Sequence, residues 1–579
     1  MLLTLEKVTK DYGLATKIKI RVGNQEVKES LIANGMDPLL AQLFAARGIK
    51  AIEEIDLNLS ALPHVTELKN ALQVGQRLAK AIANGEKIVI AADYDADGAT
   101  ACTVAMRGLR LFGAQVDYVI PSREKEGYGL SMPLIDRALT KKAALILTVD
   151  NGISAHEAVD YALSLGLEVI ITDHHLPGET LPNCLIVNPN QPSCSFPSKN
   201  IAGVGVIFYV LLALRSVLRA QGNKKAECNL AHLLDFVAIG TVADVVKLDQ
   251  VNRIFINHGL RLIRSQLSHP GVKALLKAGS RQEKDVSSRD LGFVIGPCIN
   301  AAGRLEDISL SIKCLLSDEI EEAEYYADIL NALNEKRRQT ERQMLKNAEN
   351  QINTMNLNQA IIVYSPDFHP GVIGVVAGRL KEKYHVPTLV FSCSEEGFLR
   401  GSGRSIPGLH LRDLLAHSKE ILGDKIIAFG GHALAAGLTL QADVLDEFCE
   451  VFKREVMRAA SEDIWDKTFV SDGSLLTKKA PLSLIKRLNR EVWGEGFPES
   501  RFSDVFTLLK QHPIGKRGEH SAAYLQKNGH TYKALFFYEQ QQLPPQFLLL
   551  YRPKIRIWQG KEELQLEVIY WEEILDHKG

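Results

Sequence analysis

Paired cysteines are missing from this sequence. Its 8 cysteines stand alone, and none belongs to a Cys-x-x-Cys pair. Isolated cysteines build neither a zinc ribbon nor a disulfide framework, and they are typical of a reducing compartment. The N-terminus also lacks the basic stretch and apolar core of a signal peptide. We therefore expect a cytoplasmic protein.

Long apolar runs are scarce as well. The longest, residues 201–214, contains two glycines and is shorter than the roughly 20 residues that a membrane helix needs. This run predicts a buried helix of a soluble protein. The sequence also has no internal repeat and no low-complexity tract.

Neither charge is in excess. The chain has 68 Lys and Arg against 69 Asp and Glu, a net charge of −1. Many nucleic-acid-binding proteins are visibly basic, but a carboxylate-rich metal site would cancel a basic channel in the sum. The balance therefore excludes neither partner. The hydrophobic content of 46% is ordinary for a globular protein, and 579 residues exceed what one core supports, so we expect several domains.

Alternating strands and helices begin at Lys87. The runs KIVIAA, AALILTVD and LEVIITDHH read as buried strands separated by amphipathic helices, the pattern of a doubly wound parallel sheet. Residues 318–356 are highly charged without Gly or Pro, which predicts a long bridging helix. We expect a mostly helical N-terminal segment (1–70), an α/β catalytic domain (71–275), a connecting helical region (276–357), a second α/β domain (358–460) and a C-terminal β-barrel, an OB-fold (465–575).

Acidic residues recur where the expected strands end. Because the carboxyl ends of parallel strands line the ligand crevice of such a sheet, these side chains should converge. Carboxylates suit Mg²⁺ or Mn²⁺, and an imidazole favours Mn²⁺. Two ions about 3.5–4 Å apart activate water and stabilise the leaving oxygen in phosphoryl transfer. The candidate residues are Asp93, Asp95, Asp97, Asp150, Asp173, His174, His175 and Asp244.

Each of these residues also has an ordinary structural interpretation. An Asp after a strand is most often a helix N-cap, and a His pair is more often at the surface or in the core than on a metal. The run D-x-D-x-D-G also imitates an EF-hand, but its twelfth position is Val104, where that loop needs a Glu. The joint pattern, and no single residue, carries the prediction of a metal site.

Four short motifs give the chain a family resemblance. DYDADGA, VDNG, TDHH and GTVADVV, in this order, resemble the signature motifs of the DHH phosphoesterases. The resemblance implies that two metals are bound by Asp95, Asp97, Asp150, His174 and Asp244, with Asp93 beside them. It also implies that His175 contacts the scissile phosphate, as an acid. One position departs from the pyrophosphatase-like members, which have a His where this chain has Ala91.

Basic and glycine-rich motifs predict a second phosphate-binding region, in loops. Arg donates bidentately to phosphate, and Gly lets backbone N–H groups approach it closely. GVIG and GGHALAAG precede apparent helices and would add helix N-termini. Alone, each motif is as well explained by a turn or a solvated face. The candidate residues are Arg123, Arg304, His369, Arg379, Ser402, Arg404 and His432.

These segments resemble the DHH-associated domain of RecJ-like exonucleases. There, the resemblance implies, Arg123, Ser402 and Arg404 hold a terminal 5′-phosphate, which fixes polarity. Arg304, Arg379 and His432 match positions near the nucleotides or the scissile phosphate. A cleft too narrow for a duplex would enforce single-strand preference.

Aromatic residues in the C-terminal segment alternate with Lys and Arg. OB-folds hold single strands on such stacking platforms and cations, although aromatics on short strands are more often core. The residues considered are Tyr524, Tyr532, Phe536, Tyr551 and Trp558.

Together these features predict a monomeric 5′→3′ exonuclease specific for single-stranded DNA, which uses two Mn²⁺ or Mg²⁺ ions and releases 5′-mononucleotides in repair and recombination. Single-strand-binding protein and helicases are the expected partners. One alternative is a DHH phosphodiesterase acting on short oligonucleotides or cyclic dinucleotides. Another is a non-catalytic single-strand-binding scaffold, in which metal ligands would be missing.

Overall fold

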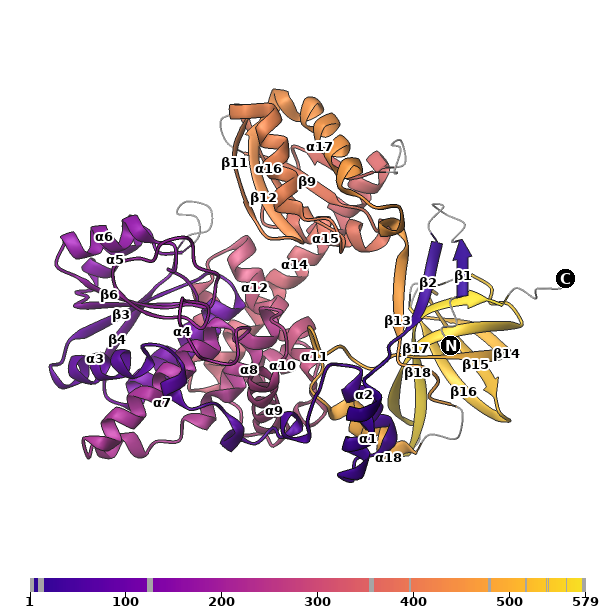
Figure 1. Ribbon diagram of the computed structural model, residues 1–579, viewed down its shortest axis with the longest axis horizontal. Coiled ribbons are helices and arrows are strands. Elements are labelled where there is room, and N and C mark those ends of the chain that lie inside the picture. The colour runs from indigo at the N-terminus through magenta and orange to yellow at the C-terminus, as the bar shows by residue number, and fades with distance from the viewer. Residues whose placement is uncertain are drawn as a thin grey trace.

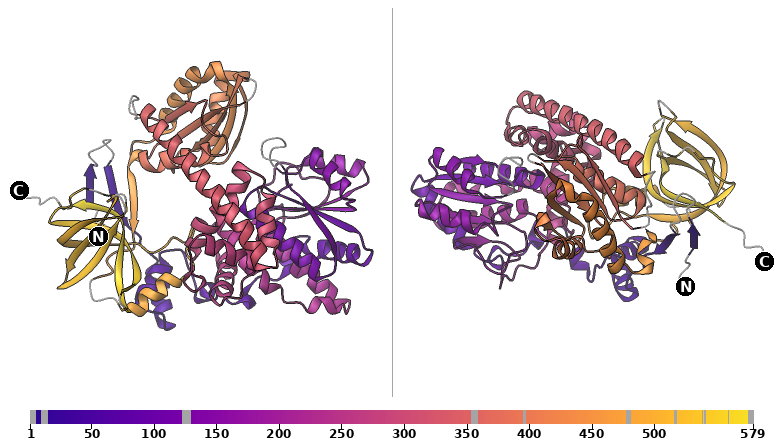
Figure 2. Two further views of the ribbon diagram at one scale, coloured as in Figure 1. Left: turned by 180° about the vertical axis from the view of Figure 1, so that it is seen from behind. Right: turned by 90° about the horizontal axis from the view of Figure 1, so that it is seen from above.

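The computed structural model describes residues 5–8, 15–121, 129–352, 359–394, 397–476, 481–515, 518–537, 539, 541–558 and 560–574. Figure 1 shows a sheet-containing lobe joined to a helical region, an upper lobe above them, and a barrel at the side. The long helix α14 (Ile320–Ile352) joins the upper lobe to the helical region, and the strand β13 (Lys467–Ser471) joins the upper lobe to the barrel. Figure 2 shows the same arrangement from behind and from above.

The sheet-containing lobe is built on a five-stranded parallel sheet of order β4-β3-β5-β6-β7. Strands β3 and β5 are buried along nearly their whole length, as expected for a sheet covered by helices on both faces. The chain leaves β3 for β4 on one side and reaches β5 on the other, which makes the β3–β5 edge a topological switch point. The strands are β3 (Lys87–Ala92), β4 (Gln115–Val119), β5 (Leu145–Val149), β6 (Glu168–Thr172) and β7 (Leu185–Val187).

Helices cover this sheet and continue into the helical region. Among the described helices, α7 alone is long and apolar enough to cross a bilayer. However, 67% of its 18-residue apolar stretch is buried inside the protein. It packs on α3, α4 and α8, which agrees with the expected buried helix. The helices are α3 (Ala71–Ala83), α4 (Ala96–Leu111), α5 (Met132–Thr140), α6 (His156–Ser164), α7 (Gly203–Ala220), α8 (Leu234–Ala243), α9 (Gln250–Arg264), α10 (Pro270–Ala278), α11 (Ser288–Asp290), the π-helical turn η7 (Leu291–Ile295), α12 (Gly296–Leu305) and α13 (Ser309–Leu316).

The expected bridging helix is α14 (Ile320–Ile352). Its 33 residues give a length of about 50 Å at 1.5 Å per residue. Its N-terminal part packs on α10, α12 and α13, and it also packs on β8 and α15 of the upper lobe. The helix therefore carries the upper lobe on the helical region, as the charged, glycine-free sequence indicated.

The upper lobe holds a five-stranded sheet of order β11-β12-β10-β9-β8, in which only β8 and β9 are parallel. Its own core lies between this sheet and α16 and α17. The strands are β8 (Ile361–Ser365), β9 (Thr388–Cys393), β10 (Phe398–Arg404), β11 (Ile426–Gly431) and β12 (Ala435–Gln441), and the helices are α15 (Ile373–Tyr384), α16 (Leu411–Leu422) and α17 (Leu445–Ala459).

The C-terminal segment forms a closed barrel of order β14-β15-β16-β18-β17, which confirms the expected OB-fold. Two of the five aromatics considered for stacking, Phe536 and Tyr551, lie in its core, whereas Tyr524 is 38% exposed. The strands are β14 (Phe502–Ile514), β15 (His520–Lys527), β16 (His530–Phe536), β17 (Gln546–Trp558) and β18 (Lys561–Glu573), and α18 (Leu482–Arg490) precedes them.

The N-terminal segment differs from its expected helical character. It begins with an antiparallel pair, β1 (Leu5–Val8) and β2 (Ala15–Ile20), before α1 (Gln25–Ala33) and α2 (Pro38–Ala45). Strand β2 pairs in parallel with β13 (Lys467–Ser471), the segment that links the upper lobe to the barrel. The strand conformation of β2 therefore depends on a partner strand about 450 residues away in the sequence. No local sequence pattern predicts this pairing.

Candidate metal centre and nucleic-acid cleft

The first acidic motif wraps around the start of α4. Asp93 follows β3, and Asp95 is the N-cap of α4, where its carboxylate accepts a hydrogen bond from Gly98 N at 2.9 Å. Asp97, in the first helical turn, accepts hydrogen bonds from Gly203 N at 2.7 Å and Val204 N at 3.0 Å. The capping interpretation therefore holds for Asp95. Asp97 accepts hydrogen bonds from the first backbone N–H groups of α7, which have no partner within that helix.

Asp150 is held in an uncommon backbone conformation directly after β5. Its φ is +63°, and its N–H donates to Thr172 O at 3.0 Å, so β6 fixes it in place. A Cβ atom built on Gly203 would lie 2.5 Å from Asp150 Oδ1, a distance that real Cβ atoms do not reach. The carboxylate therefore presses against the glycine that opens α7.

The His pair is arranged by Asp173, which follows β6. Asp173 Oδ1 accepts hydrogen bonds from the backbone N–H groups of His174 and His175, at 2.7 and 3.1 Å, and from His175 Nδ1 at 2.7 Å. Asn190 Nδ2 donates to His174 O at 2.6 Å, and Asn188 Nδ2 to His175 O at 2.9 Å. With its Nδ1 proton on Asp173, the His175 ring presents Nε2.

These elements bring the predicted residues together at the carboxyl edge of the sheet. His174 Nε2 lies 3.1 Å from Asp150 Oδ1 and 3.5 Å from Asp244 Oδ2, Asp244 being the residue that ends α8. In each of three groups the potential ligand atoms lie within 4.8 Å of one another. The groups are Asp93, Asp95 and Asp150; Asp97, His174 and Asp244; and Asp150, His174 and His175.

The donor set suits a divalent cation. Asp93 Oδ1, His174 Nε2 and Asp244 Oδ2 are buried and make no hydrogen bond within the described part of the chain. Buried polar atoms are normally paired, so such atoms need a partner that is not a protein group. Carboxylate oxygens with one neutral imidazole form a hard, mixed ligand set of the kind that holds Mn²⁺ or Mg²⁺.

The electrostatics of the centre point the same way. Burial, followed by the charge of the neighbouring aspartates, raises the pKa of Asp97 to about 7 and raises the pKa values of Asp93, Asp150 and Asp244 well above the usual range. Burial lowers the pKa of His174 to about 4, which keeps it a neutral ligand. So many carboxyl groups repel one another unless cations compensate them.

His175 behaves differently from His174. Burial alone would lower its pKa, but the hydrogen bond and charge of Asp173, with further charge from Asp93 and Asp97, outweigh burial and leave the pKa raised. Asp173 was a candidate from sequence by its place after a strand, but its role in orienting the two histidines was not expected. Its position before the two histidines was the available signal, since an acidic residue beside a catalytic imidazole commonly orients it.

The upper lobe presents a second polar cluster. Ser402 and Arg404 lie on β10, and Arg404 Nη1 is 3.4 Å from Ser402 Oγ. A Cβ on Gly374 would lie 2.9 Å from Ser402 Oγ and 3.1 Å from Arg404 Nη2, so both side chains face the first turn of α15. A hydroxyl, a guanidinium and the N-terminal end of a helix are together suited to an anion.

Several of the basic motifs are not loops. Arg304 is in α12, Arg379 in α15, and Ser402 and Arg404 in β10, while GGHALAAG forms the turn between β11 and β12 with no helix after it. The glycines of GSGRS suggested a turn, but in β10 they make room for neighbours: a Cβ at position 401 would lie 2.5 Å from the Phe391 ring.

The remaining phosphate-site candidates are spread along the junction of the two lobes. Arg304 Nη1 donates to Gly371 O at 3.0 Å, and His369 Nδ1 accepts from Gly371 N at 3.0 Å. A cavity of about 390 Å³ lies between the lobes here, lined by Tyr94 as well as by Arg304 and Gly371.

Two further candidates are less closely tied to that cavity, and one lies outside the described residues. Arg379 pairs with Glu341 of α14 at 2.9 Å. His432 is exposed in the β11–β12 turn, where its N–H donates to Ala435 O at 2.8 Å. Arg123 lies outside the described residues.

Comparisons with known proteins bear on the whole chain. Family models match it in three places: the DHH family N-terminal domain at 87–241, the DHHA1 domain at 357–458 and the RecJ OB domain at 471–570. The single-stranded-DNA-specific exonuclease RecJ of Escherichia coli K12 is 41% identical over 514 residues, which cover 86% of this chain and 89% of that protein. The chain belongs to the RecJ family. The RecJ protein of Haemophilus influenzae is 40% identical over 93% of this chain and 96% of its own length.

Solved structures of the RecJ family agree with this fold. RecJ from Thermus thermophilus in complex with Mn²⁺ superposes on 97% of this chain and 80% of its own, with a TM-score of 0.81 and 27% identity. The same protein in complex with Mg²⁺ gives a TM-score of 0.74 and 25% identity. The expected fold class, with its DHH domain, DHHA1 domain and OB barrel, is confirmed.

Proposed function

We propose that this chain is a 5′→3′ exonuclease specific for single-stranded DNA, which hydrolyses phosphodiester bonds with two divalent cations and releases 5′-mononucleotides. One observation carries the proposal: the acidic and imidazole groups of three strand ends lie within coordinating reach of one another, and a phosphate-suited cluster occupies the lobe across from them. The RecJ proteins it resembles are named as exonucleases of single-stranded DNA.

In this proposal two cations are shared among six residues. The groups of mutually close ligand atoms suggest one ion near Asp93, Asp95 and Asp150 and another near Asp97, His174 and Asp244, with Asp150 close to both. Such cations, when bound, activate the attacking water and offset charge on the phosphate oxygens. The protein residues fix where that chemistry takes place.

His175 is proposed to contact the scissile phosphate. Its Nδ1 proton is held by Asp173, so Nε2 is the atom available to donate to a phosphate or leaving-group oxygen. The backbone N–H of His175 is held by the same carboxylate, so ring and main chain are fixed together. Such pre-organisation lets the group act without rearrangement.

The polarity of cleavage is proposed to come from the upper lobe. Ser402, Arg404 and the first turn of α15 would hold a terminal 5′-phosphate, with Arg123, whose side chain lies outside the described residues, as a further expected ligand. Arg304, His369, Arg379 and His432 are proposed to follow the next nucleotides. If the end phosphate is anchored there, only a 5′ end reaches the acidic centre.

The deciding experiment is digestion of strands labelled at one end. The wild-type protein should release mononucleotides from a 5′-phosphorylated single strand in Mn²⁺, leave a blunt duplex intact and stop when the cation is chelated. Asp150→Ala should abolish release while remaining folded. Release from 3′ ends, or equal cleavage of a dinucleotide and a long strand, would contradict the proposal and favour a small-substrate phosphodiesterase.

The cellular setting and the domain boundaries are proposed with the activity. We propose a cytoplasmic monomer acting in repair and recombination beside single-strand-binding protein and helicases. We also propose the five segments 1–70, 71–275, 276–357, 358–460 and 465–575 as its units, with the first completed by its pairing with β13.

A further inference from the structure

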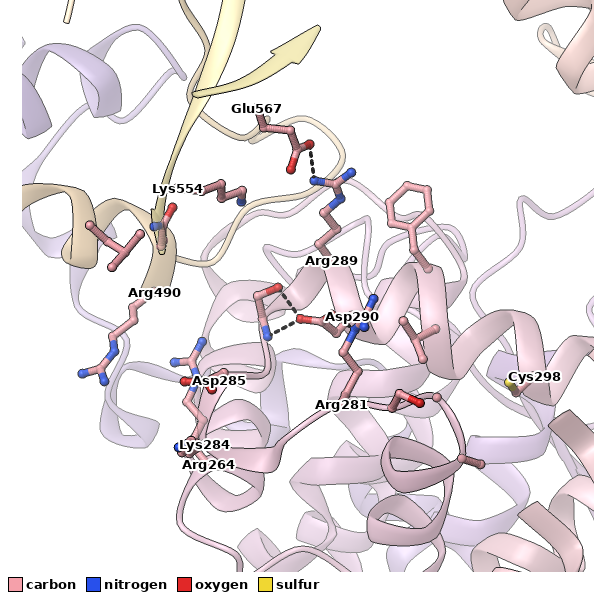
Figure 3. A pocket seen from close by; sticks show the side chains of 18 of the residues that line it. Arg264, Arg281, Lys284, Asp285, Arg289, Asp290, Cys298, Arg490, Lys554 and Glu567 are labelled. Carbon is pink, nitrogen blue, oxygen red and sulfur yellow. Dashed lines mark hydrogen bonds and ion pairs between the residues drawn. The ribbon is translucent and has the colours of Figure 1, made fainter. Parts of the chain in front are cut away.

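A second cationic region lies between the helical region and the barrel, away from the acidic centre. A cavity of about 1420 Å³ opens there (Figure 3). Next to it, a smaller cavity of about 530 Å³ lies between α9 and α18. The two share Arg264, Lys486 and Arg490. We call the smaller one the arginine pocket; its charged lining residues are Arg253, Arg264, Lys486, Arg487, Arg490 and Glu491.

Most cations of the larger cavity are already neutralised by carboxylates. Arg289 pairs with Glu567 at 2.8 Å, and Arg281 with Asp290 at 2.8 Å (Figure 3). Ion pairs at such a partly exposed junction are accounted for as contacts between domains. Because their charges are already paired, they are poor binding groups for an anionic ligand. The smaller cavity is therefore the better candidate for an anion site.

The arginine pocket is balanced only in part, since Lys486 pairs with Glu562 at 2.6 Å and Arg487 with Glu491 at 3.5 Å. Among the described residues, Arg264 and Arg490 have no carboxylate within ion-pair distance, and Arg264 Nε donates only to Val286 O, at 2.8 Å. Burial first, then the nearby charge of Arg490, lowers the pKa of Arg264. Figure 3 shows Arg490 extending from α18 and Arg264 from the helical region opposite it. The charge of Asp290 acts on Arg264 in the opposite sense but does not outweigh these effects, so an anion between the two cations would be stabilised.

A third arginine is buried beneath this pair. Arg253 is 1% exposed, and its Nε and Nη2 have no hydrogen-bonding partner in the described part of the chain. Its Nη1 donates to Glu54 O at 3.3 Å, and its guanidinium lies 4.1 Å from the centre of the Phe497 ring. Burying an unpaired guanidinium is costly. The one carboxylate lining the pocket, Glu491, lies 3.5 Å from Arg487, and its charge also acts on Arg253 without lying within ion-pair distance of it.

The cations of the pocket come from the faces of two helices. On α18, Ser483, Lys486, Arg487 and Arg490 recur at helical spacing and line the pocket as a single stripe. The opposite face of α18 is buried through Ile485 and Leu488. This stripe is exposed to solvent, and it borders the same pocket as Arg253 and Arg264 of α9.

We propose that the arginine pocket is a phosphate-binding site, separate from the catalytic centre, that takes a ligand with closely spaced phosphate groups. Planar guanidinium groups bind phosphate oxygens bidentately, and three of them around one cavity suit a polyphosphate better than a single carboxylate. The phosphates belong either to a free polyphosphate or nucleotide or to the backbone of a bound single strand, which share this chemistry.

Binding of tripolyphosphate tests the site. Titration is followed by calorimetry on the full-length Arg404→Ala variant in EDTA, so that neither the end-phosphate cluster nor bound metals contribute. Saturable binding is expected. Adding Arg490→Ala or Arg264→Gln should weaken it about tenfold each, since one charge-assisted hydrogen-bonding group is lost. Arg412→Ala, an exposed arginine of α16, is the matched control and should leave affinity unchanged. Equal melting temperatures exclude misfolding.

The source of the phosphates is separated by competition. Displacement of tripolyphosphate by a 30-nucleotide single strand, but not by a 6-nucleotide one, assigns the site to the nucleic-acid backbone. Displacement by neither assigns it to a free ligand, and both results support a phosphate site. The proposal is overturned if tripolyphosphate does not bind saturably, or if the Arg490 and Arg264 variants bind it like the parent. Neither result would touch the nuclease proposal, which rests on other residues.

Discussion

Replacing Gly203 with Ala should disable the proposed metal centre through a single methyl group. The new Cβ would lie 2.5 Å from Asp150 Oδ1 and 2.7 Å from Asp150 Cγ, about 1 Å inside ordinary contact. Relief requires Asp150 to move, or the start of α7 to move. Since Gly203 N donates to Asp97 Oδ2, the second route shifts Asp97 as well.

The size of the effect follows from that overlap. Overpacking a buried site costs about 1–3 kcal/mol of stability, whereas a displacement of about 1 Å at reacting groups can cost about 100-fold in rate. We therefore expect Gly203→Ala to stay folded, to melt a few degrees lower, and to lose about 100-fold or more in Mn²⁺-dependent release of nucleotides. Thermal unfolding and a single-strand digestion assay measure the two effects separately.

Gly205→Ala is the matched control on the same helix. Its Cβ would meet Ile201 Cγ1 at 2.5 Å and the Phe255 ring at 3.3 Å, which are core side chains and not site residues. It should lose comparable stability while keeping most of its activity. If Gly203→Ala digests a single strand within about twofold of wild type, the tight contact with Asp150 does not position the proposed ligand, and the reasoning fails.

Four further predictions concern the same cleft. Asp173→Asn should lower the His175 pKa, because the charge that raises it is removed, and should cut activity about 10–100-fold; an unchanged pH–rate profile would contradict this. Binding of Mn²⁺ should tighten as pH rises, because the pKa of Asp97 is about 7 in the metal-free fold and its proton must leave. Between pH 3.8 and about 7, Asp97 holds its proton in the folded protein but loses it in the unfolded chain. The stability of the metal-free protein should therefore fall as the pH rises through this range. A melting temperature in EDTA that does not change with pH would refute this prediction. Arg404→Ala should reduce the preference for a 5′-phosphorylated end about tenfold in competition digests, with Arg412→Ala, an exposed arginine of α16, as the control, and an unchanged preference would remove Arg404 from the end site.

The acidic centre could be predicted from sequence because its residues obey a local rule. Asp93, Asp150 and Asp173 each directly follow a buried strand, and parallel strands end at one edge. The contacts that hold these carboxylates in place follow no such local rule. Asp97 holds the first N–H groups of α7 about 106 positions away, and Gly203 is required only because Asp150 presses on it. These depend on packing that a single sequence does not reveal.

Glycine misled the prediction of the upper lobe. In GSGRS and GGHALAAG it suggested loops and helix starts, because glycine is common in turns. In β10, however, Gly403 stands where a Cβ would lie 2.7 Å from Leu389 and 2.8 Å from Leu411, so the strand is threaded between side chains of β9 and α16. Only the presence of those neighbours distinguishes a strand glycine of this kind from a turn glycine.

The spacing between the two halves of the cleft is set by direct contacts. Arg304 of α12 donates across the junction to Gly371 O, and Gly371 leaves no room for a Cβ, which would lie 2.3 Å from Arg304 O. On the far side, Glu341 of α14 accepts from both Arg337 and Arg379, so the bridging helix holds α15 by its exposed face. Because α15 begins at the Ser402 and Arg404 cluster, these contacts also fix how far a held end phosphate lies from the acidic residues. Glu341→Gln should therefore make the position of cleavage less precise, so that products longer than one nucleotide appear. Its effect on the affinity for DNA should be smaller.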